Sequence, residues 1–366
     1  MQLPPIIVRG PGNSRQVLPG QLFFLPFVLL SMLAMIAAYF SSEWMSVKYY
    51  ADSYMIWGFQ RYAESFIKGG SFNNTALIYN ILGIEIDSYW YRAAATGLFC
   101  GLIWANLLMA KPGRLTPSLI FITYGSVYIG LMYLSQISKE FVVLLLIISF
   151  LLMARNRWTA LAWTVLAVMY AYYFRGYWYL VLYLYLWLLL TGAYCKRPWQ
   201  LFLTIVIGLL VITLAHEVLN GGSILKHREI VNAGREGNIY AKTLIKPLFE
   251  SSNPLTDWLN CALIWMQTLI PVKLLFSGSP QHLVSGLMML TTFMLLFQAN
   301  SRFWSGDRQN AAIYRGFCLF MSFTAVQSCF EPDYGSMLKH MTPLLPLAIA
   351  FICSQMTRPA KAELSS

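Results

Sequence analysis

The charged residues of this chain lie in short polar gaps between long apolar runs. Charged residues make up only 11% of the sequence, whereas apolar residues make up 58%, which is more than the core of a soluble domain uses. Lipid accommodates such a surplus, and in lipid only helices or closed barrels satisfy the backbone. The pattern therefore predicts an all-α, polytopic membrane protein whose polar gaps are turns at the membrane surfaces.

Ten apolar windows are separated by these gaps. We interpret each as a transmembrane helix, because roughly 20 residues cross the hydrocarbon core. A further apolar stretch, residues 256–277, is interrupted by Pro271 and Lys273. The sequence thus predicts one integral membrane domain, residues 1–366, with about ten transmembrane helices, or eleven if this stretch also crosses. The windows are residues 22–40, 93–110, 117–134, 141–153, 159–174, 177–194, 201–216, 283–299, 316–330 and 344–356.

The distribution of basic residues predicts the orientation. With a cytoplasmic N-terminus and ten crossings, half of the 26 basic residues but only two of the 15 acids face the cytoplasm, as the positive-inside rule requires. An eleventh crossing would export the basic 302–315 loop, so we interpret residues 256–277 as re-entrant or interfacial. Both termini are then cytoplasmic. The basic residues assigned to the cytoplasm are Arg9, Arg15, Lys111, Arg114, Arg155, Arg157, Lys196, Arg197, Arg302, Arg308, Arg315, Arg358 and Lys361.

Two longer polar segments, residues 41–92 and 217–282, fall on the outer side. We interpret both as extracytoplasmic loops, partly amphipathic helix, that fold over the bundle. The net charge of +11 indicates orientation and contact with anionic phospholipid. No basic patch interleaves with aromatic residues as in nucleic-acid binders, so we expect no nucleic-acid partner.

The second outer segment contains basic residues at a regular spacing. Arg228, Arg235 and Lys242 recur every seven positions, so one face of a helix can hold a diphosphate. A helix neutralised by its own Glu229 and Glu236 is the alternative.

The first outer segment combines carboxylates with aromatic rings. Rings stack on the faces of sugars while acids accept their hydroxyls, so this composition suits sugar binding. An ordinary interfacial helix would have the same composition. The residues concerned are Asp52, Glu64, Glu85, Asp87, Tyr49, Tyr50, Tyr54, Trp57, Trp90 and Tyr91.

Three short outer turns carry charges close to the membrane, where charges are costly and often functional. The pair Lys139 and Glu140 forms the first, and an ion pair that ends a helix is the alternative reading of it. Arg175 forms the second. It lies in an aromatic stretch with Tyr177, where a guanidinium can stack on rings and still bind an anion. A snorkelling anchor in an aromatic belt is the alternative.

The third turn, residues 331–340, is the richest in chemistry. It offers two carboxylates, a phenol, an ammonium and an imidazole, which together can position an acceptor hydroxyl and take its proton. A plain solvated loop is the alternative. The residues that carry these groups are Glu331, Asp333, Tyr334, Lys339 and His340.

The cysteines and histidines show no pattern of a metal site. The six cysteines lie in or beside apolar runs without a CxxC pair, and the four histidines have no partner at metal-ligand spacing. We therefore expect buried free cysteines, no metal and no cofactor.

Taken together, three motifs resemble a known family. These are Ser138-Lys139-Glu140-Phe141, Arg175-Gly176-Tyr177-Trp178, and Glu331-Pro332-Asp333-Tyr334-Gly335-Ser336 followed by Lys339-His340. With the length and the two enlarged outer loops, they resemble Wzy-type or EpsG-type bacterial polysaccharide polymerases over most of the chain.

The resemblance implies a glycosyltransferase of the bacterial inner membrane with a GT-C-like architecture and a periplasmic active face. Such an enzyme transfers a growing glycan from undecaprenyl diphosphate onto a new lipid-linked repeat unit. A flippase and a chain-length regulator are the partners that it implies. No nucleotide sugar is needed, which agrees with the lack of a Gly-rich phosphate loop.

Chemical roles follow from the leaving group of this reaction. Cations stabilise the departing diphosphate without a metal, while a carboxylate or imidazole deprotonates the attacking hydroxyl. We assign His340 or Asp333 as the base, with Asp52 in reserve. The residues assigned to the diphosphate and substrate are Arg175, Arg228, Arg235, Lys139, Lys339, Tyr177 and Tyr334.

Three other functions stay open at this stage. A GT-C enzyme that adds one sugar from a polyprenyl phosphate is often marked by an acidic pair in the first outer loop, but Asp52 has no adjacent acid. A lipid-linked sugar flippase or other transporter predicts charges through the spans or repeated halves. A membrane O-acyltransferase requires a buried mid-span histidine, for which His216 is the nearest candidate.

Overall fold

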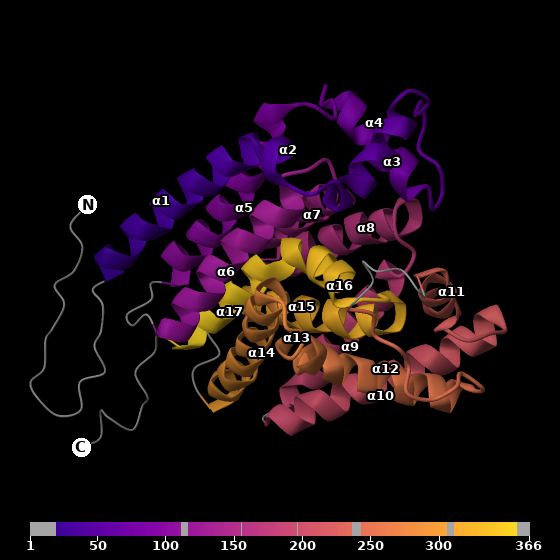
Figure 1. Cartoon of the computed structure of the whole chain (residues 1–366). Helices are drawn as coiled ribbons and strands as arrows, with labels where there is room; N and C mark the ends of the chain where they lie inside the picture. Colours follow the sequence, from indigo (N-terminus) through magenta and orange to yellow (C-terminus); the bar gives the residue numbers. More distant parts are fainter. Residues whose placement is uncertain are drawn as a thin grey trace, which may run out of the picture.

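The computed structural model describes residues 20–110, 116–154, 156–195, 197–235, 243–305 and 311–356. Within these ranges the chain folds into α-helices and short 3-10 helices, joined by turns (Figure 1). Leu244 and Asp333 form an isolated antiparallel β-bridge. The predicted all-α class is confirmed for this part of the chain.

Each of the ten apolar windows lies in a helix. These helices are α1 (Gly20–Tyr39), α5 (Tyr89–Ala110), α6 (Pro117–Leu134), α7 (Lys139–Met153), α8 (Arg157–Tyr173), α9 (Trp178–Thr191), α10 (Pro198–Asn220), α14 (Pro280–Ser305), α15 (Ala311–Phe330) and α17 (Leu345–Met356). Five helical segments of the described chain are long and apolar enough to cross a membrane: Pro117–Leu134, Pro198–Asn220, Pro254–Leu275, Pro280–Trp304 and Tyr334–Gln355.

Local sequence signals set several helix ends. The side chain of Thr116 accepts a hydrogen bond from Leu119 N and Pro117 follows it, so α6 begins there. Asn156 caps α8 in the same way. Gly221 ends α10 with a φ of 64°, a left-handed conformation that glycine adopts without a Cβ penalty.

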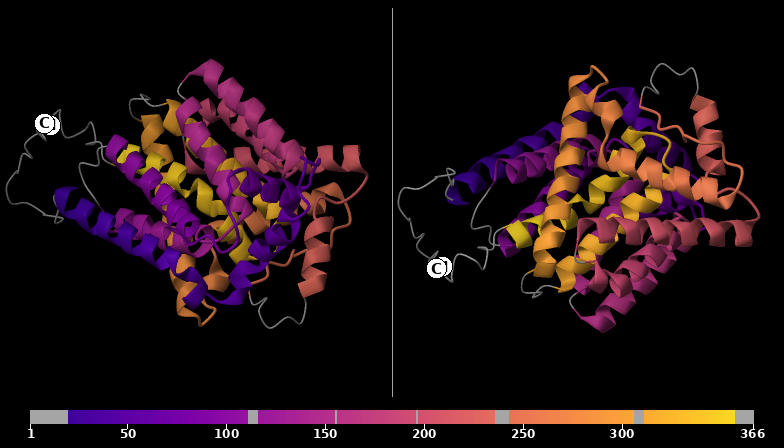
Figure 2. Two further views of the ribbon diagram at one scale, coloured as in Figure 1. Left: turned by 90° about the horizontal axis from the view of Figure 1, so that it is seen from above. Right: turned by 90° about the horizontal axis from the view of Figure 1, so that it is seen from below.

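The core is centred on α15 and α17, which pack against each other and against α9 and α5 (Figure 2). The α15 residues from Gly316 to Cys329 are all buried. By contrast, α1 lies at the periphery and exposes a stripe of large apolar side chains. Such a stripe has the character of a lipid-facing surface. Its residues are Leu25, Leu29, Met32, Leu33 and Ile36.

The predicted first outer segment is helical and docks onto the turns of the bundle. It contains α2 (Ser41–Trp44), η1 (Val47–Tyr50), α3 (Ala51–Gln60) and α4 (Ser71–Ile81). Ser53 Oγ donates to Ile137 O at 2.8 Å, and Gly69 N donates to Tyr172 O at 3.0 Å. These bonds hold the segment over one end of the molecule. We call this the turn-bearing end, defined by the turns at residues 135–138, 174–177 and 331–333.

The second outer segment begins and ends at this same end. It contains α11 (Lys226–Arg235), α12 (Pro254–Leu269) and α13 (Val272–Leu275). Before α12, Ser251 contacts Ser223 at 2.7 Å; after it, Lys273 Nζ donates to Leu244 O at 3.1 Å, and Leu244 pairs with Asp333. These contacts tie both ends of the α12–α13 segment to other parts of the second outer segment, although its length and composition would also permit a crossing.

Several residues used for the sequence predictions lie outside the described residues, as do 1–19 and 357–366, which include both termini. They are Arg9, Arg15, Lys111, Arg114, Arg155, Lys196, Glu236, Lys242, Asp307, Arg308, Arg358, Lys361 and Glu363.

Candidate functional site

The three charged turns of the sequence meet around one buried carboxylate. Glu140, in the first turn of α7, has 0% of its side chain exposed. Arg175, at the α8–α9 turn, donates from Nη2 to Glu140 Oε1 at 2.7 Å and from Nη1 to the Tyr177 hydroxyl at 3.1 Å. The Tyr177 ring in turn stacks on Phe330, 5.7 Å away. Arg175 thus joins the ends of α7, α8 and α15.

His340 links this pair to the third turn. It lies on α16 (Tyr334–Met341), and its Nδ1 is 2.6 Å from Glu140 Oε1 while its Nε2 is 3.2 Å from Glu331 Oε1. Arg175 Nη1 also lies 3.2 Å from His340 Nδ1. Both ring nitrogens therefore face carboxylate oxygens, and Nδ1 also faces an arginine donor, so the hydrogen-bond role of Nδ1 depends on the tautomer.

Lys339 connects the buried cluster to the first outer segment. Its Nζ lies 2.7 Å from Asp52 Oδ2 and 3.9 Å from Glu140 Oε2. Lys139 Nζ is 3.8 Å from the same Asp52 oxygen and lies over the Phe72 ring. Burial of Asp52 disfavours its charged form, but Lys339 and Lys139 outweigh this, so the pKa of the carboxyl is below its usual value.

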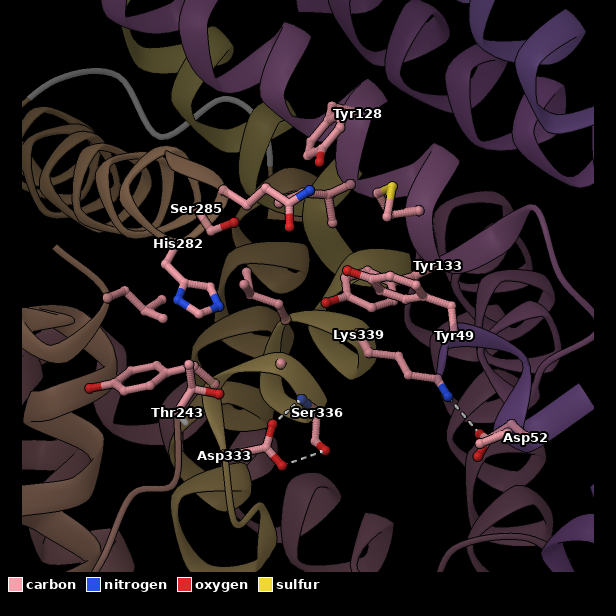
Figure 3. A pocket seen from close by; sticks show the side chains of 18 of the residues that line it. Tyr49, Asp52, Tyr128, Tyr133, Thr243, His282, Ser285, Asp333, Ser336 and Lys339 are labelled. Atoms are coloured by element: carbon pink, nitrogen blue, oxygen red, sulfur yellow. Dashed lines mark hydrogen bonds and ion pairs between the residues drawn. The ribbon is translucent and has the colours of Figure 1, made fainter. Parts of the chain in front are cut away.

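A cavity of about 430 Å³ opens beside this cluster (Figure 3). Its volume is in the range of small-molecule sites. Five of the residues assigned to the site from the sequence line it: Asp52, Arg235, Asp333, Tyr334 and Lys339. They come from α3, α11 and α16, so the first and second outer segments contribute to the cavity together with the third turn.

Arg235 and Asp333 form an ion pair on the cavity wall. Asp333 is the N-cap of α16: it accepts hydrogen bonds from Ser336 N at 2.8 Å and from Ser336 Oγ at 3.1 Å. The carboxylate is thus held by the helix that follows it and by a cation that lies almost 100 residues earlier in the chain.

Arg228 occupies a different environment from Arg235, although both are on α11. Its side chain is completely buried and donates from Nη1 to Ser328 O at 3.0 Å. Nε and Nη2 have no hydrogen-bond partner among the described residues. Burial lowers the pKa of the Arg228 guanidinium. The expected common basic face of this helix is therefore divided between the protein interior and the cavity.

The other predicted site residues are not among the described residues that line the cavity: Arg175, Tyr177, Lys139, Arg228 and His340. Tyr334 lines the cavity with its ring buried and its hydroxyl bonded to Gln267 O at 2.9 Å. The predicted residues thus divide into those that line the cavity and those that do not.

The site residues assigned from the sequence did not include Glu140 and Glu331, whose carboxylates flank His340. Their place in the charged turns was the available signal. Sequence reasoning also missed the contributions of α6 and α14 to the cavity, since Tyr133 and Ser285 lie in apolar windows without local charge. Within the described residues, no group of three His, Cys, Asp or Glu side chains is placed to hold a metal. The six cysteines are free and buried, as expected.

Comparison of the chain with protein-family models, with curated proteins and with solved structures found no match.

Proposed function

We propose that this protein is a polysaccharide polymerase of the Wzy or EpsG type in the bacterial inner membrane. It transfers a growing glycan from undecaprenyl diphosphate to a new lipid-linked repeat unit. The observation that carries the proposal is the cavity at the turn-bearing end, where Arg235, Lys339, Asp333 and Asp52 converge beside a bundle with a lipid-facing surface.

In this proposal the ten helices of the apolar windows are the crossings, arranged as a GT-C-like bundle, and the turn-bearing end is periplasmic. One observation and one general rule support this topology. Both ends of the α12–α13 segment contact other parts of the second outer segment, as those of a re-entrant or interfacial segment do. The positive-inside rule then places both termini in the cytoplasm.

The proposed reaction exchanges one bond at the anomeric carbon of the growing glycan. The bond from this carbon to the diphosphate oxygen breaks, and its electron pair leaves with undecaprenyl diphosphate. A hydroxyl oxygen of the new repeat unit bonds to the carbon, and its proton passes to Asp333. Arg235 and Lys339 bind the diphosphate and stabilise the charge that develops on it.

The ion pairs of the cavity suit this sequence of events. Arg235 is paired with Asp333 in the structure, and Lys339 is paired with Asp52. A diphosphate that binds Arg235 releases the Asp333 carboxylate from this ion pair, so its oxygens can accept the proton of the attacking hydroxyl. Glu140, Arg175 and His340 act as positioning residues, because they fix the helix that carries Lys339.

The direct test uses purified protein in lipid nanodiscs with undecaprenyl-diphosphate-linked repeat units. Wild type should convert these into a ladder of multimers. Arg235→Ala should lower the rate by about 10²–10³-fold, and Asp333→Asn by about 10²–10⁴-fold. Asparagine keeps the N-cap of α16, so this variant removes the charge without removing the cap.

Arg61→Ala is the matched control. Arg61 is another outer arginine, placed over the Trp57 ring and outside the cavity lining, so its loss should leave the rate unchanged. If wild type forms no multimers, or if the Arg235 and Asp333 variants form them at the wild-type rate, the proposal is wrong.

A further inference from the structure

One wall of the cavity is aromatic. Tyr49 from η1 and Tyr128 and Tyr133 from α6 line it. The rings of Tyr49 and Tyr133 are 6.2 Å apart between centroids at 61°, and both are half-buried. Figure 3 shows these two rings on one side of the cavity, next to Lys339 and Asp52. Two segments about 80 residues apart in sequence thus build one aromatic surface.

The opposite side of the cavity is polar and comes from the first turns of α14. Gln281, His282 and Ser285 line it, and Figure 3 shows His282 and Ser285 across from Tyr49 and Tyr133. An amide, an imidazole and a hydroxyl can both donate and accept hydrogen bonds. This side therefore complements a ligand that carries several hydroxyls.

The phenols add to this capacity. Burial raises the pKa of Tyr49, and the nearby Tyr128 raises it further, so the Tyr49 hydroxyl stays neutral and able to donate or accept. A tyrosine offers an apolar ring face and a polar tip together. A sugar ring has the same combination, with C–H groups on its faces and hydroxyls at its edge.

The charged groups occupy a separate part of the cavity. Asp333 with Ser336 and Asp52 with Lys339 lie below the tyrosines in Figure 3. A cavity with cations in one part and neutral aromatic and polar groups in another fits a ligand with the same division, an anionic group joined to a neutral, hydroxyl-rich ring. A polyprenyl tail alone would offer no hydrogen bonds to the polar side of the cavity.

We infer that Tyr49 and Tyr133, opposite Gln281 and Ser285, form a subsite for one sugar ring of the acceptor repeat unit. The identification of this sugar as part of the acceptor rests on the proposed function. The inference that the wall binds a sugar ring rests on the lining residues alone. A ring that lies on the tyrosines shares the cavity with Asp333, so in the proposed reaction the subsite holds the acceptor in the same cavity as the base.

The test measures binding of the repeat-unit oligosaccharide after its release from lipid and diphosphate. Protein in nanodiscs is titrated with this oligosaccharide by saturation-transfer NMR. Tyr49→Ala and Tyr133→Ala should each weaken binding about 3- to 10-fold, from the loss of aromatic contact. Tyr49→Phe and Tyr133→Phe keep the ring and should bind close to wild type.

Two controls make the result specific. Tyr62→Ala removes an outer tyrosine that is 76% exposed and outside the cavity lining, and it should not change binding. The phenylalanine variants guard against misfolding of the alanine variants.

The outcomes separate this inference from the proposed function. If wild type does not bind the oligosaccharide, or if both alanine variants bind it as wild type does, the subsite is wrong, even where wild type polymerises lipid-linked repeats. If binding follows the tyrosines but wild type forms no polymer, the sugar subsite stands and the polymerase proposal fails.

Discussion

At the scale of single residues, the ends of several helices are joined through one buried carboxylate. Glu140 is completely buried, and Arg175 and His340 both contact its Oε1. Removal of one partner from a buried ion pair leaves an uncompensated charge and is strongly destabilising, whereas the intact pair itself contributes little. The cluster of Glu140, Arg175 and His340 therefore fixes the relative positions of these helices and adds little net stability.

Arg175→Ala should lower the free energy of unfolding by about 3–5 kcal/mol, because it leaves Glu140 without its shortest guanidinium contact. Glu140→Gln in the same chain should recover part of this loss, since it removes the stranded charge. A double-mutant cycle on thermal stability in detergent measures the coupling. If the stability losses of the two single variants simply add in the double variant, Arg175 and Glu140 do not form a coupled buried pair.

Asp52 gives a prediction for pH. Its folded pKa is lowered, so the stabilisation from its lysine contacts is present above the unfolded pKa of about 3.9 and is lost as pH falls through the lower folded value. The stability difference between wild type and Asp52→Asn should be constant from about pH 5 to 8 and shrink below about pH 4. Melting curves across this range measure it. A difference that grows on acidification would contradict the assignment.

At the scale of elements, close packing between helices fixes the bundle. A Cβ added at Gly130 of α6 would clash with the Phe99 ring of α5, and both residues are in the core. Gly101, also on α5, has nothing within 4 Å of the same added atom. The two glycines thus differ in role although both are in apolar helices.

Gly130→Ala should cost about 1–3 kcal/mol, because the aromatic ring must move to make room. Gly101→Ala should be neutral or stabilising by up to about 1 kcal/mol, since alanine is the better helix former. Thermal stability of the two variants in the same detergent measures this contrast. Equal effects would mean that α5 and α6 do not approach at Gly130.

The elements also show how far the sequence predicts the structure. The ten windows became helices because each is apolar and bounded by polar or capping residues such as Thr116 and Asn156. The contribution of Tyr133 to the cavity and the pairing of Arg235 with Asp333 could not be predicted. Both depend on contacts between segments far apart in sequence, for which no local pattern exists.

At the scale of the whole molecule, the sequence predicts which turns lie together better than it predicts where each side chain of those segments points. The three charged turns were expected on one side, and they meet around Glu140. The division of α11 was not expected, because a seven-residue spacing places Arg228 and Arg235 on one helical face. The helix nevertheless packs Arg228 against α15 and leaves Arg235 at the cavity.

The proposed topology predicts which residues are reached from outside the cell membrane. In a variant without its six native cysteines, Ser88→Cys and Ser277→Cys should both react with a membrane-impermeant maleimide added from the periplasmic side. Tyr194→Cys, 79% exposed between α9 and α10, should react after the membrane is opened. If position 277 instead reacts only after the membrane is opened, as position 194 should, then α12–α13 crosses the membrane.

The central claim is that this chain polymerises lipid-linked repeat units at the turn-bearing end. Its most direct test is the size ladder of the surface glycan in a deletion strain that carries wild type or Arg235→Ala. The account predicts single repeat units in the deletion strain, a full ladder with wild type, and a short or absent ladder with Arg235→Ala. A repeat unit that loses one sugar on deletion, or a ladder that does not change, would contradict it.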